Sequence, residues 1–425
     1  MKKAKCLLVL GLIVISTLLS GCWDALPVER RAFVTSLGVD WLPEAPHLNV
    51  TIVHPLMEER RMRENRVLTI RAHSVSEALT LWNHTNGQHL SLAVLGVLVI
   101  GEAAAKQPLS PVLNDLCAHP DFRLGAHVIV TRGTAQALLS VQPPAHQLIS
   151  VHLRSLLDRA IFRRDAPRTT VSAFITHMMM PGMDAMTALV SPIGTLDRRQ
   201  AEKEAEAAAP NGQQAGGGGG GGAGAGGGGN GGETAPRPPQ EDVQVVGAAI
   251  WQGDKVVETL TLPEAQFVYL AMGKANRLMV NVMFPPDERL FPKQSAMVLS
   301  MESVTANWSL EMVQEVPHYT LRLQVRLSLH NYAGDVDLSK KDNSALLEKM
   351  IGDVLRQNTL QAVQKVAATG GDPLRLGQLM RRQYPELWNS KEWRNKIQTA
   401  QFTVKAEAQI RNIGLELLRL EPVDK

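Results

Sequence analysis

A strict alternation of apolar and polar side chains runs through Leu321-Arg322-Leu323-Gln324-Val325-Arg326-Leu327-Ser328-Leu329. Successive strand residues point to opposite faces of a sheet, so this period of two predicts a strand with one buried face. The same pattern recurs over Phe402–Ile410, and a helix from about Ser344 to Gly370 separates the two segments. Strands followed by helices and a returning strand predict an antiparallel sheet with helices packed on one face.

A hairpin and a helix are expected upstream of this sheet. Two apolar segments, Val243–Trp251 and Lys255–Thr261, flank the turn Gln252-Gly253-Asp254. Pro263 then opens a helix that reaches Met272 and ends at Gly273. These elements predict a small central domain over residues 243–288.

The chain before residue 197 mixes strands and helices. Ser74 and Glu77 have the spacing of a capping box, and Ser110-Pro111 opens a second helix. Leu92–Ile100 is an almost continuous apolar run, which is typical of a strand buried on both faces. With further strands near Leu48–Val53 and Val128–Val130, this order predicts a β-α-β-α unit with parallel pairing.

The clearest boundary in the chain is Gly216–Gly232, where 14 of 17 residues are glycine. Such a composition cannot bury apolar surface, so we expect a flexible linker. The sequence therefore predicts a multidomain α+β chain. Its expected parts are a signal peptide (1–21), a mixed α/β domain (22–196), the linker (197–242), the central domain (243–288) and a C-terminal α+β domain (289–425).

The N-terminus has the features of a bacterial lipoprotein signal. Three lysines stand among the first five residues, and the apolar run Leu7–Leu19 is shorter than the roughly 20 residues of a transmembrane helix. Leu19-Ser20-Gly21-Cys22 follows and resembles a lipobox, in which the Cys22 thiol is acylated and becomes the new N-terminus. The alternatives are an ordinary secretory signal with an incidental cysteine, and an uncleaved anchor.

Composition argues against several function classes. The chain has 44 Lys+Arg and 41 Asp+Glu, and loss of the three signal lysines leaves a formally neutral protein. A neutral chain with 4 % aromatic residues gives no support for nucleic-acid binding. No catalytic motif stands in a suitable frame and no cysteine pair has zinc spacing, so we expect no enzymatic activity, cofactor or metal. Cys117 shares a helical face with Leu113 and Leu116 and is expected to be buried.

An ordered set of short motifs resembles the Ger(x)C spore-germination lipoproteins, the C subunits of nutrient germinant receptors. The resemblance begins at Gly21-Cys22-Trp23-Asp24 and covers nearly the whole chain except the linker. Further residues that carry it are Asp40, Gly247, Asp254, Asp372, Gly377, Trp388 and Trp393. We interpret these mainly as structural residues: Asp372 as a helix cap, Gly377 as a point of close helix approach or a bend, and the two tryptophans as anchors of helices on the C-terminal sheet. Direct contact with receptor partners is the alternative role.

The resemblance implies a function. A protein of this family is expected to be a lipid-anchored, non-enzymatic subunit needed for nutrient-triggered germination. It would lie on the outer face of the spore inner membrane beside polytopic A-type and B-type subunits. A solute-binding lipoprotein of a transporter is the main alternative, and a lipid-anchored enzyme is the second.

Overall fold

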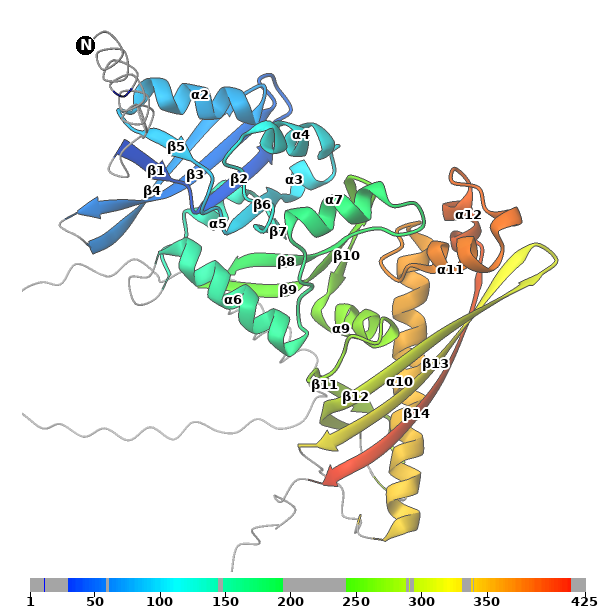
Figure 1. The fold of residues 1–425 in the computed structure, drawn as a ribbon. Helices are drawn as coiled ribbons and strands as arrows, with labels where there is room; N and C mark the ends of the chain where they lie inside the picture. Colours follow the sequence, from blue (N-terminus) through cyan, green and yellow to red (C-terminus); the bar gives the residue numbers. More distant parts are fainter. Residues whose placement is uncertain are drawn as a thin grey trace, which may run out of the picture.

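The computed structural model shows two large sheets joined side by side (Figure 1). It describes residues 30–58, 61–143, 148–193, 242–287, 294–330 and 340–413, with the single residues 11, 290 and 338. An eight-stranded sheet forms the N-terminal half, a four-stranded sheet forms the C-terminal half, and β1 (Arg31–Phe33) pairs with β5 (His89–Ser91) in a small third sheet. The expected α+β class is confirmed.

The eight-stranded sheet has the order β10-β9-β8-β7-β6-β2-β3-β4. Its strands, in chain order, are β2 (Ser36–Trp41), β3 (Leu48–Glu58), β4 (Arg61–Ala72), β6 (Val97–Gly101), β7 (His127–Thr131), β8 (Met186–Ile193), β9 (Asp242–Gln252) and β10 (Lys255–Thr261). The central strands β2, β6, β7 and β8 are parallel, which confirms the predicted parallel pairing for β6 and β7. The predicted strand at Leu48–Val53 is β3, which instead pairs antiparallel with β2 and β4.

Helices cover both faces of this sheet. The helices are α2 (Val75–Thr85), α3 (Glu102–Ala105), α4 (Ser110–Ala118), α5 (Ala135–Leu139), α6 (Ile149–Arg163) and α7 (Val171–Met179). Leu98 and Ile100 of β6 lie in the core with α2, α4 and α7, whereas Val97 and Val99 lie in the core with α5 and α6. Burial on both faces explains why β6 is apolar at every position.

Two N-terminal details differ from the sequence-based expectations. The apolar run Leu92–Ile100 is not one strand, because Leu92–Gly96 forms a turn and β6 begins at Val97. Leu92 and Leu95 are buried within that turn, and buried turn residues have the same apolar character as a strand. The prediction for Cys117 is wrong: this thiol is exposed, because α4 buries Val112, Leu113 and Leu116 instead.

The hairpin and helix predicted over Val243–Met272 form as expected, but residues 243–288 do not make a separate domain. β9 pairs with β8 from Met186↔Ile250 to Ile193↔Asp242, which places the hairpin in the N-terminal sheet. Ala249 and Trp251 lie in the N-terminal core, whereas Ala248 and Ile250 lie in the C-terminal core. Helix α9 (Leu262–Ala271) also packs in the C-terminal core. Since the two faces of β9 belong to different cores, this strand couples the two halves.

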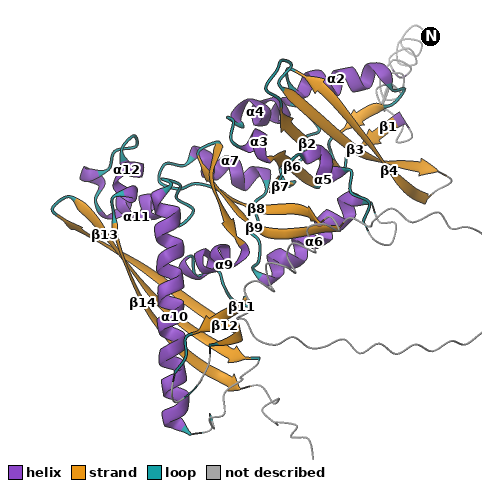
Figure 2. Cartoon of the chain, turned by 180° about the vertical axis from the view of Figure 1, so that it is seen from behind, coloured by secondary structure: helices purple, strands orange, loops and turns teal. Residues whose placement is uncertain are grey.

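The C-terminal sheet has the order β11-β12-β13-β14, and α10 lies across one face of it (Figure 2). Its elements are β11 (Met279–Phe284), β12 (Ser295–Val313), β13 (Val316–Leu329), α10 (Lys341–Ala368), α11 (Leu376–Gln383), the 3₁₀ turn η3 (Pro385–Leu387), α12 (Trp393–Gln398) and β14 (Gln401–Ile413). The sheet is mixed rather than purely antiparallel, because β14 pairs parallel with β13. The chain runs back along α10 between these two strands, and such a crossover returns the next strand in the same direction.

The predicted signal peptide with Cys22, Trp23 and Asp24 lies outside the described residues, as does the glycine-rich segment. The described residues on either side of that segment are Ile193 and Asp242. Ile193 closes β8 and Asp242 opens β9, and the two residues are direct partners in the antiparallel ladder. Residues 194–241 therefore connect two adjacent strand ends within one sheet.

Candidate functional site

Three aspartates named from the sequence hold the first turns of three helices. Asp40 accepts hydrogen bonds from the backbone N–H groups of Ala135 (2.7 Å) and Gln136 (3.0 Å) at the start of α5. Asp254 accepts from both the N–H (3.1 Å) and the hydroxyl (2.6 Å) of Ser110 at the start of α4. Each carboxylate satisfies donors that lack an intrahelical partner and faces the positive end of the helix dipole.

Asp372 does the same for α11 at a fully buried position. Its two carboxylate oxygens accept from the N–H groups of Leu376 (2.9 Å) and Gly377 (2.8 Å). The capping role assigned to Asp372 agrees with this geometry. Burial raises the pKa of Asp372 to about 7, while the two backbone hydrogen bonds oppose the rise. Burial also raises the pKa of Asp40, against its own two backbone bonds.

Asp184, which the sequence analysis did not single out, is the centre of the contact between the two halves. It lies just before β8, and its side chain is 1 % exposed. Its carboxylate accepts from the N–H of Gly253 (2.8 Å) in the β9–β10 turn and from the N–H of Asp372 (3.0 Å). Both terminal nitrogens of the Arg394 guanidinium in α12, Nη1 and Nη2, also donate to it, Nη2 at 3.0 Å. We call Asp184, Asp372 and Arg394 the junction cluster.

The junction cluster sits beside a very close backbone contact. Gly182 and Gly377 meet so closely that a Cβ on Gly377 would lie 2.7 Å from the Gly182 Cα and 2.7 Å from the Trp393 ring. The Gly182 carbonyl accepts from the N–H of Gln378 (2.9 Å). Trp393 is buried and stacks on the half-buried Trp388, with ring centroids 5.9 Å apart. The close approach predicted for Gly377 and the anchoring predicted for Trp393 agree with this packing.

Gly247 has a comparable steric role inside the hairpin. A Cβ at this position would lie 1.8 Å from the Leu260 carbonyl oxygen of the neighbouring strand. The ladder between β8 and β9 shifts register beside it, between Leu189 and Val190. Because Gly247 has no side chain, β9 can pair closely with both β8 and β10 at this bulge.

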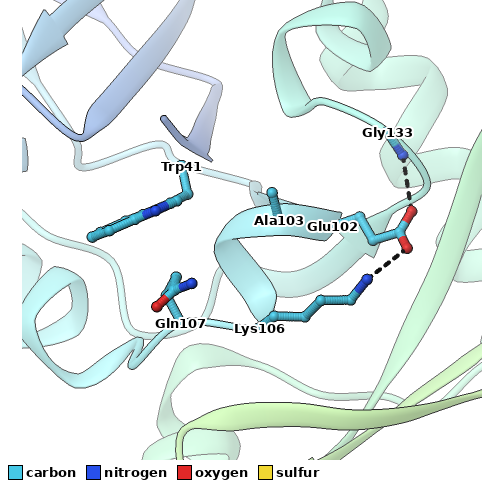
Figure 3. Close-up of a pocket in the computed structure, with 6 residues that line it drawn as sticks. All are labelled: Trp41, Glu102, Ala103, Lys106, Gln107 and Gly133. Atoms are coloured by element: carbon cyan, nitrogen blue, oxygen red, sulfur yellow. Dashed lines mark hydrogen bonds and ion pairs between the residues drawn. The ribbon is translucent and has the colours of Figure 1, made fainter. Parts of the chain in front are cut away.

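A shallow pocket of about 410 Å³ lies at the carboxyl ends of β2 and β6 (Figure 3). Its lining residues are Trp41, Glu102, Ala103, Lys106, Gln107 and Gly133. Strand order reverses between β2 and β6, and open α/β sheets bind ligands at such positions. Here Glu102 is already engaged by Lys106 (3.1 Å) and by the N–H of Gly133 (3.4 Å). The charged groups of the pocket thus compensate one another.

Within the described ranges, no group of three or more His, Cys, Asp or Glu side chains could hold a metal ion. Among those same residues, no helix is long and apolar enough to cross a membrane. The hydrogen bonds of Asp40, Asp184 and Asp372 connect elements of the fold.

Comparison with known proteins places both halves in one family. Residues 24–192 match the description "Spore germination protein N-terminal domain", and residues 246–414 match "Spore germination B3/ GerAC like, C-terminal". This chain belongs to the Ger(x)C spore germination family. The two matched regions together contain every family-motif residue named from the sequence after Trp23, from Asp24 to Trp393.

Curated relatives within this spore germination family are distant in sequence but similar in length. Spore germination protein KC of Bacillus subtilis (strain 168) is 22 % identical over 438 residues, which cover 97 % of this chain and 96 % of the relative. The putative spore germination protein YfkR of the same strain is 26 % identical over 204 residues, covering 45 % and 51 %. The crystal structure of the GerBC protein matches with a TM-score of 0.48 and 14 % identity, over 88 % of this chain and 97 % of that chain.

Proposed function

We propose that this chain is a lipid-anchored, non-enzymatic subunit of a nutrient germinant receptor in the spore inner membrane. The observation that carries the proposal is the family match over both halves, which spans residues 24–192 and 246–414. The polar residues found at the candidate site support it, because they are engaged in capping helices and joining the halves.

Acylation of Cys22 supplies the anchor in this proposal. A diacylglycerol on its thiol, together with a palmitate or other acyl chain on the new N-terminus, holds a protein durably at a bilayer, whereas one chain holds it only marginally. The protein would then lie on the outer face of the spore inner membrane. Confinement to that surface raises its effective concentration near the polytopic A-type and B-type subunits.

The contact between the two halves supports a docking role. Asp184 accepts from the N-terminal hairpin turn, from the loop before α11 and from α12, so its carboxylate joins the two halves. A preorganised surface loses little conformational entropy on binding. The subunit would therefore present a fixed arrangement of both halves to its membrane partners.

Replacement of Cys22 by alanine tests the anchor and the role together. We expect Cys22→Ala to appear in the soluble fraction or to remain unprocessed, and we expect nutrient-triggered germination to fail in a strain that lacks other C subunits. The matched control is Cys117→Ala, because this thiol is exposed on α4 and outside the lipobox. Full germination in a strain that lacks the chain altogether would contradict the receptor role, and a processed, membrane-bound Cys22→Ala protein would contradict the anchor.

A further inference from the structure

The pocket at the carboxyl ends of β2 and β6 is built on three neighbouring parallel strands. Trp41 is the last residue of β2, Glu102 directly follows β6, and Gly133 lies in the segment after β7. The other lining residues come from α3 and the turn after it, namely Ala103, Lys106 and Gln107. Since β6 pairs with both β2 and β7, the segments that line the pocket start from fixed positions in the sheet.

The indole of Trp41 gives this pocket a flat apolar surface. The imidazole of His47 stacks on the indole, with ring centroids 4.9 Å apart and an angle of 6° between the two planes. His47 is held in the turn after β2, where its backbone carbonyl accepts from the N–H of Leu42 at 2.7 Å. Gln107 lies on one side of the plane of the Trp41 ring (Figure 3). The orientation of the indole is thus fixed by its own neighbours.

Small residues leave the pocket open to solvent. Ala103 is exposed on α3, and in the described part of the chain nothing lies within 4 Å of a Cβ placed on Gly133. A ring-shaped ligand could therefore enter from solvent without displacing a bulky side chain at these two positions.

The polar groups that line the pocket carry no net charge. The Glu102 carboxylate accepts from Nζ of Lys106 at 3.1 Å and from the N–H of Gly133 at 3.4 Å. The hydrogen bond from Lys106 lowers the pKa of Glu102, so the acid is ionised and the pair is neutral overall. An ammonium and a carboxylate each have more hydrogen-bonding capacity than this one contact uses, and the Gln107 amide adds a neutral donor and acceptor.

We propose that this pocket binds a saccharide ring that stacks on Trp41. One face of a sugar ring presents C–H groups that pack on an aromatic surface, while the hydroxyls at its edge both donate and accept hydrogen bonds. Glu102, Lys106 and Gln107 supply partners of both kinds. The volume of about 410 Å³ lies within the range of small-molecule sites.

The same features disfavour other ligand classes. An ion, or the zwitterion of an amino acid, would have to compete with the existing Glu102–Lys106 pair for each charged group. A purely apolar ligand would cover these polar groups without replacing their contacts with water, which costs free energy. The inference does not depend on the receptor role.

Ligand binding to the full-length protein, in a detergent without a sugar headgroup, tests the proposal. The probes are D-glucose, D-galactose and sucrose, with L-alanine as the zwitterionic comparison. Calorimetric titration should detect binding of at least one sugar, and saturation-transfer NMR should show its ring C–H protons in contact with the protein. Failure of all three sugars to bind, or tighter binding of L-alanine than of every sugar, would overturn the proposal.

Two variants locate the site. Trp41→Ala should weaken sugar binding about fivefold, because it removes the stacking surface. Ala103→Leu should abolish measurable binding, because its larger side chain would project into the pocket, whereas its Tm should stay close to that of the wild type since the position is exposed. The matched control is Ala345→Leu at an exposed position of α10 outside the pocket. Equal sugar affinities of Ala103→Leu and Ala345→Leu would contradict this location.

The salt dependence of binding tests the neutral character of the ligand separately. Screening by salt weakens attraction between charges, but it has little effect on stacking and on hydrogen bonds to hydroxyls. The affinity of the wild type for the sugar should therefore be the same at low and high potassium chloride. A steep loss of affinity at high salt would contradict recognition by stacking and neutral hydrogen bonds.

Discussion

At the scale of single residues, the junction cluster places two carboxylates beside one guanidinium. Asp184 accepts from both Nη1 and Nη2 of Arg394, whereas the carboxylate of Asp372 accepts from two backbone N–H groups. The two acids therefore differ in their electrostatic surroundings. Asp184 forms an ion pair with Arg394, whereas Asp372 is buried with a raised pKa. Their contributions to stability should therefore respond differently to substitution and to pH.

Replacing Arg394 should be costly because Asp184 would keep a buried charge without its partner. We expect Arg394→Met to lower the free energy of unfolding by about 3 kcal/mol, measured by urea denaturation. The control is Arg382→Met, an exposed arginine of α11, which should change stability by less than about 0.5 kcal/mol. The double variant Asp184→Asn/Arg394→Met should lose less than the sum of the single losses. A loss below 1 kcal/mol for Arg394→Met would show that the ion pair contributes little.

Asp372 should make stability fall as pH rises. Its pKa of about 7 in the folded protein exceeds the ordinary value of 3.8, so between these values the native state holds the proton more often. The stabilisation from this carboxyl is complete below about pH 4 and is lost as pH rises through 7, at a limiting slope of about 1.4 kcal/mol per pH unit. Denaturation of the wild type and of Asp372→Asn at pH 5 and pH 7.5 isolates this effect. Parallel pH profiles of the two proteins would contradict the prediction.

At the scale of elements, the contact between the segment before β8 and α11 depends on two glycines. Gly377→Ala would force a Cβ against the Gly182 backbone and the Trp393 ring. We expect a loss of about 1–3 kcal/mol, because neither neighbour can move without disturbing the junction cluster. Gly87→Ala is the control, since nothing lies within 4 Å of a Cβ at that position. Equal stabilities of the two variants in chemical denaturation would show that the contact can relax.

Element types were predictable from the sequence, whereas their pairing was not. The strand at Leu321–Leu329 and the hairpin turn at Gly253 are each determined by residues adjacent in sequence. Both elements form as predicted. The direction of β14 depends on the path of α10, and no pattern within β14 itself encodes it. Likewise, the apolar sequence of β9 predicts a buried strand. It does not indicate that the two faces of this strand pack in two different cores.

The role of a site residue could be inferred from the sequence only where that residue acts on its own neighbours in sequence. Asp40 and Asp254 were named through the family resemblance, and the helices that they cap lie far from them along the chain. Asp372 precedes the helix that it caps by a few residues, so its role could be inferred. Asp184 is bound to Arg394, which lies far along the chain, and its nearest sequence neighbours are apolar. The sequence shows Asp184 only as a single acidic residue among apolar neighbours. That pattern does not indicate which basic residue it pairs with.

At the scale of the whole molecule, the length of the glycine-rich segment should matter little to the fold. Its flanking residues Ile193 and Asp242 are partners in the sheet, so the segment does not set the distance between the halves. Deleting Gly216–Gly232 should change the free energy of unfolding by less than about 1 kcal/mol, because loop-closure entropy varies slowly with length. A loss of several kcal/mol in urea denaturation would show that the deleted residues make stabilising contacts.

The pairing of β8 with β9 also allows the polypeptide to be divided. Two fragments ending near Ile193 and starting near Asp242 would each keep one strand of that ladder, and β9 would still bring its own residues to both cores. We expect the separately expressed pieces to reassemble into one folded complex without a covalent link. If Cys22 is acylated as proposed, the N-terminal piece could remain in the membrane while the other is exchanged, which would make the C-terminal half replaceable by labelled or mutated copies.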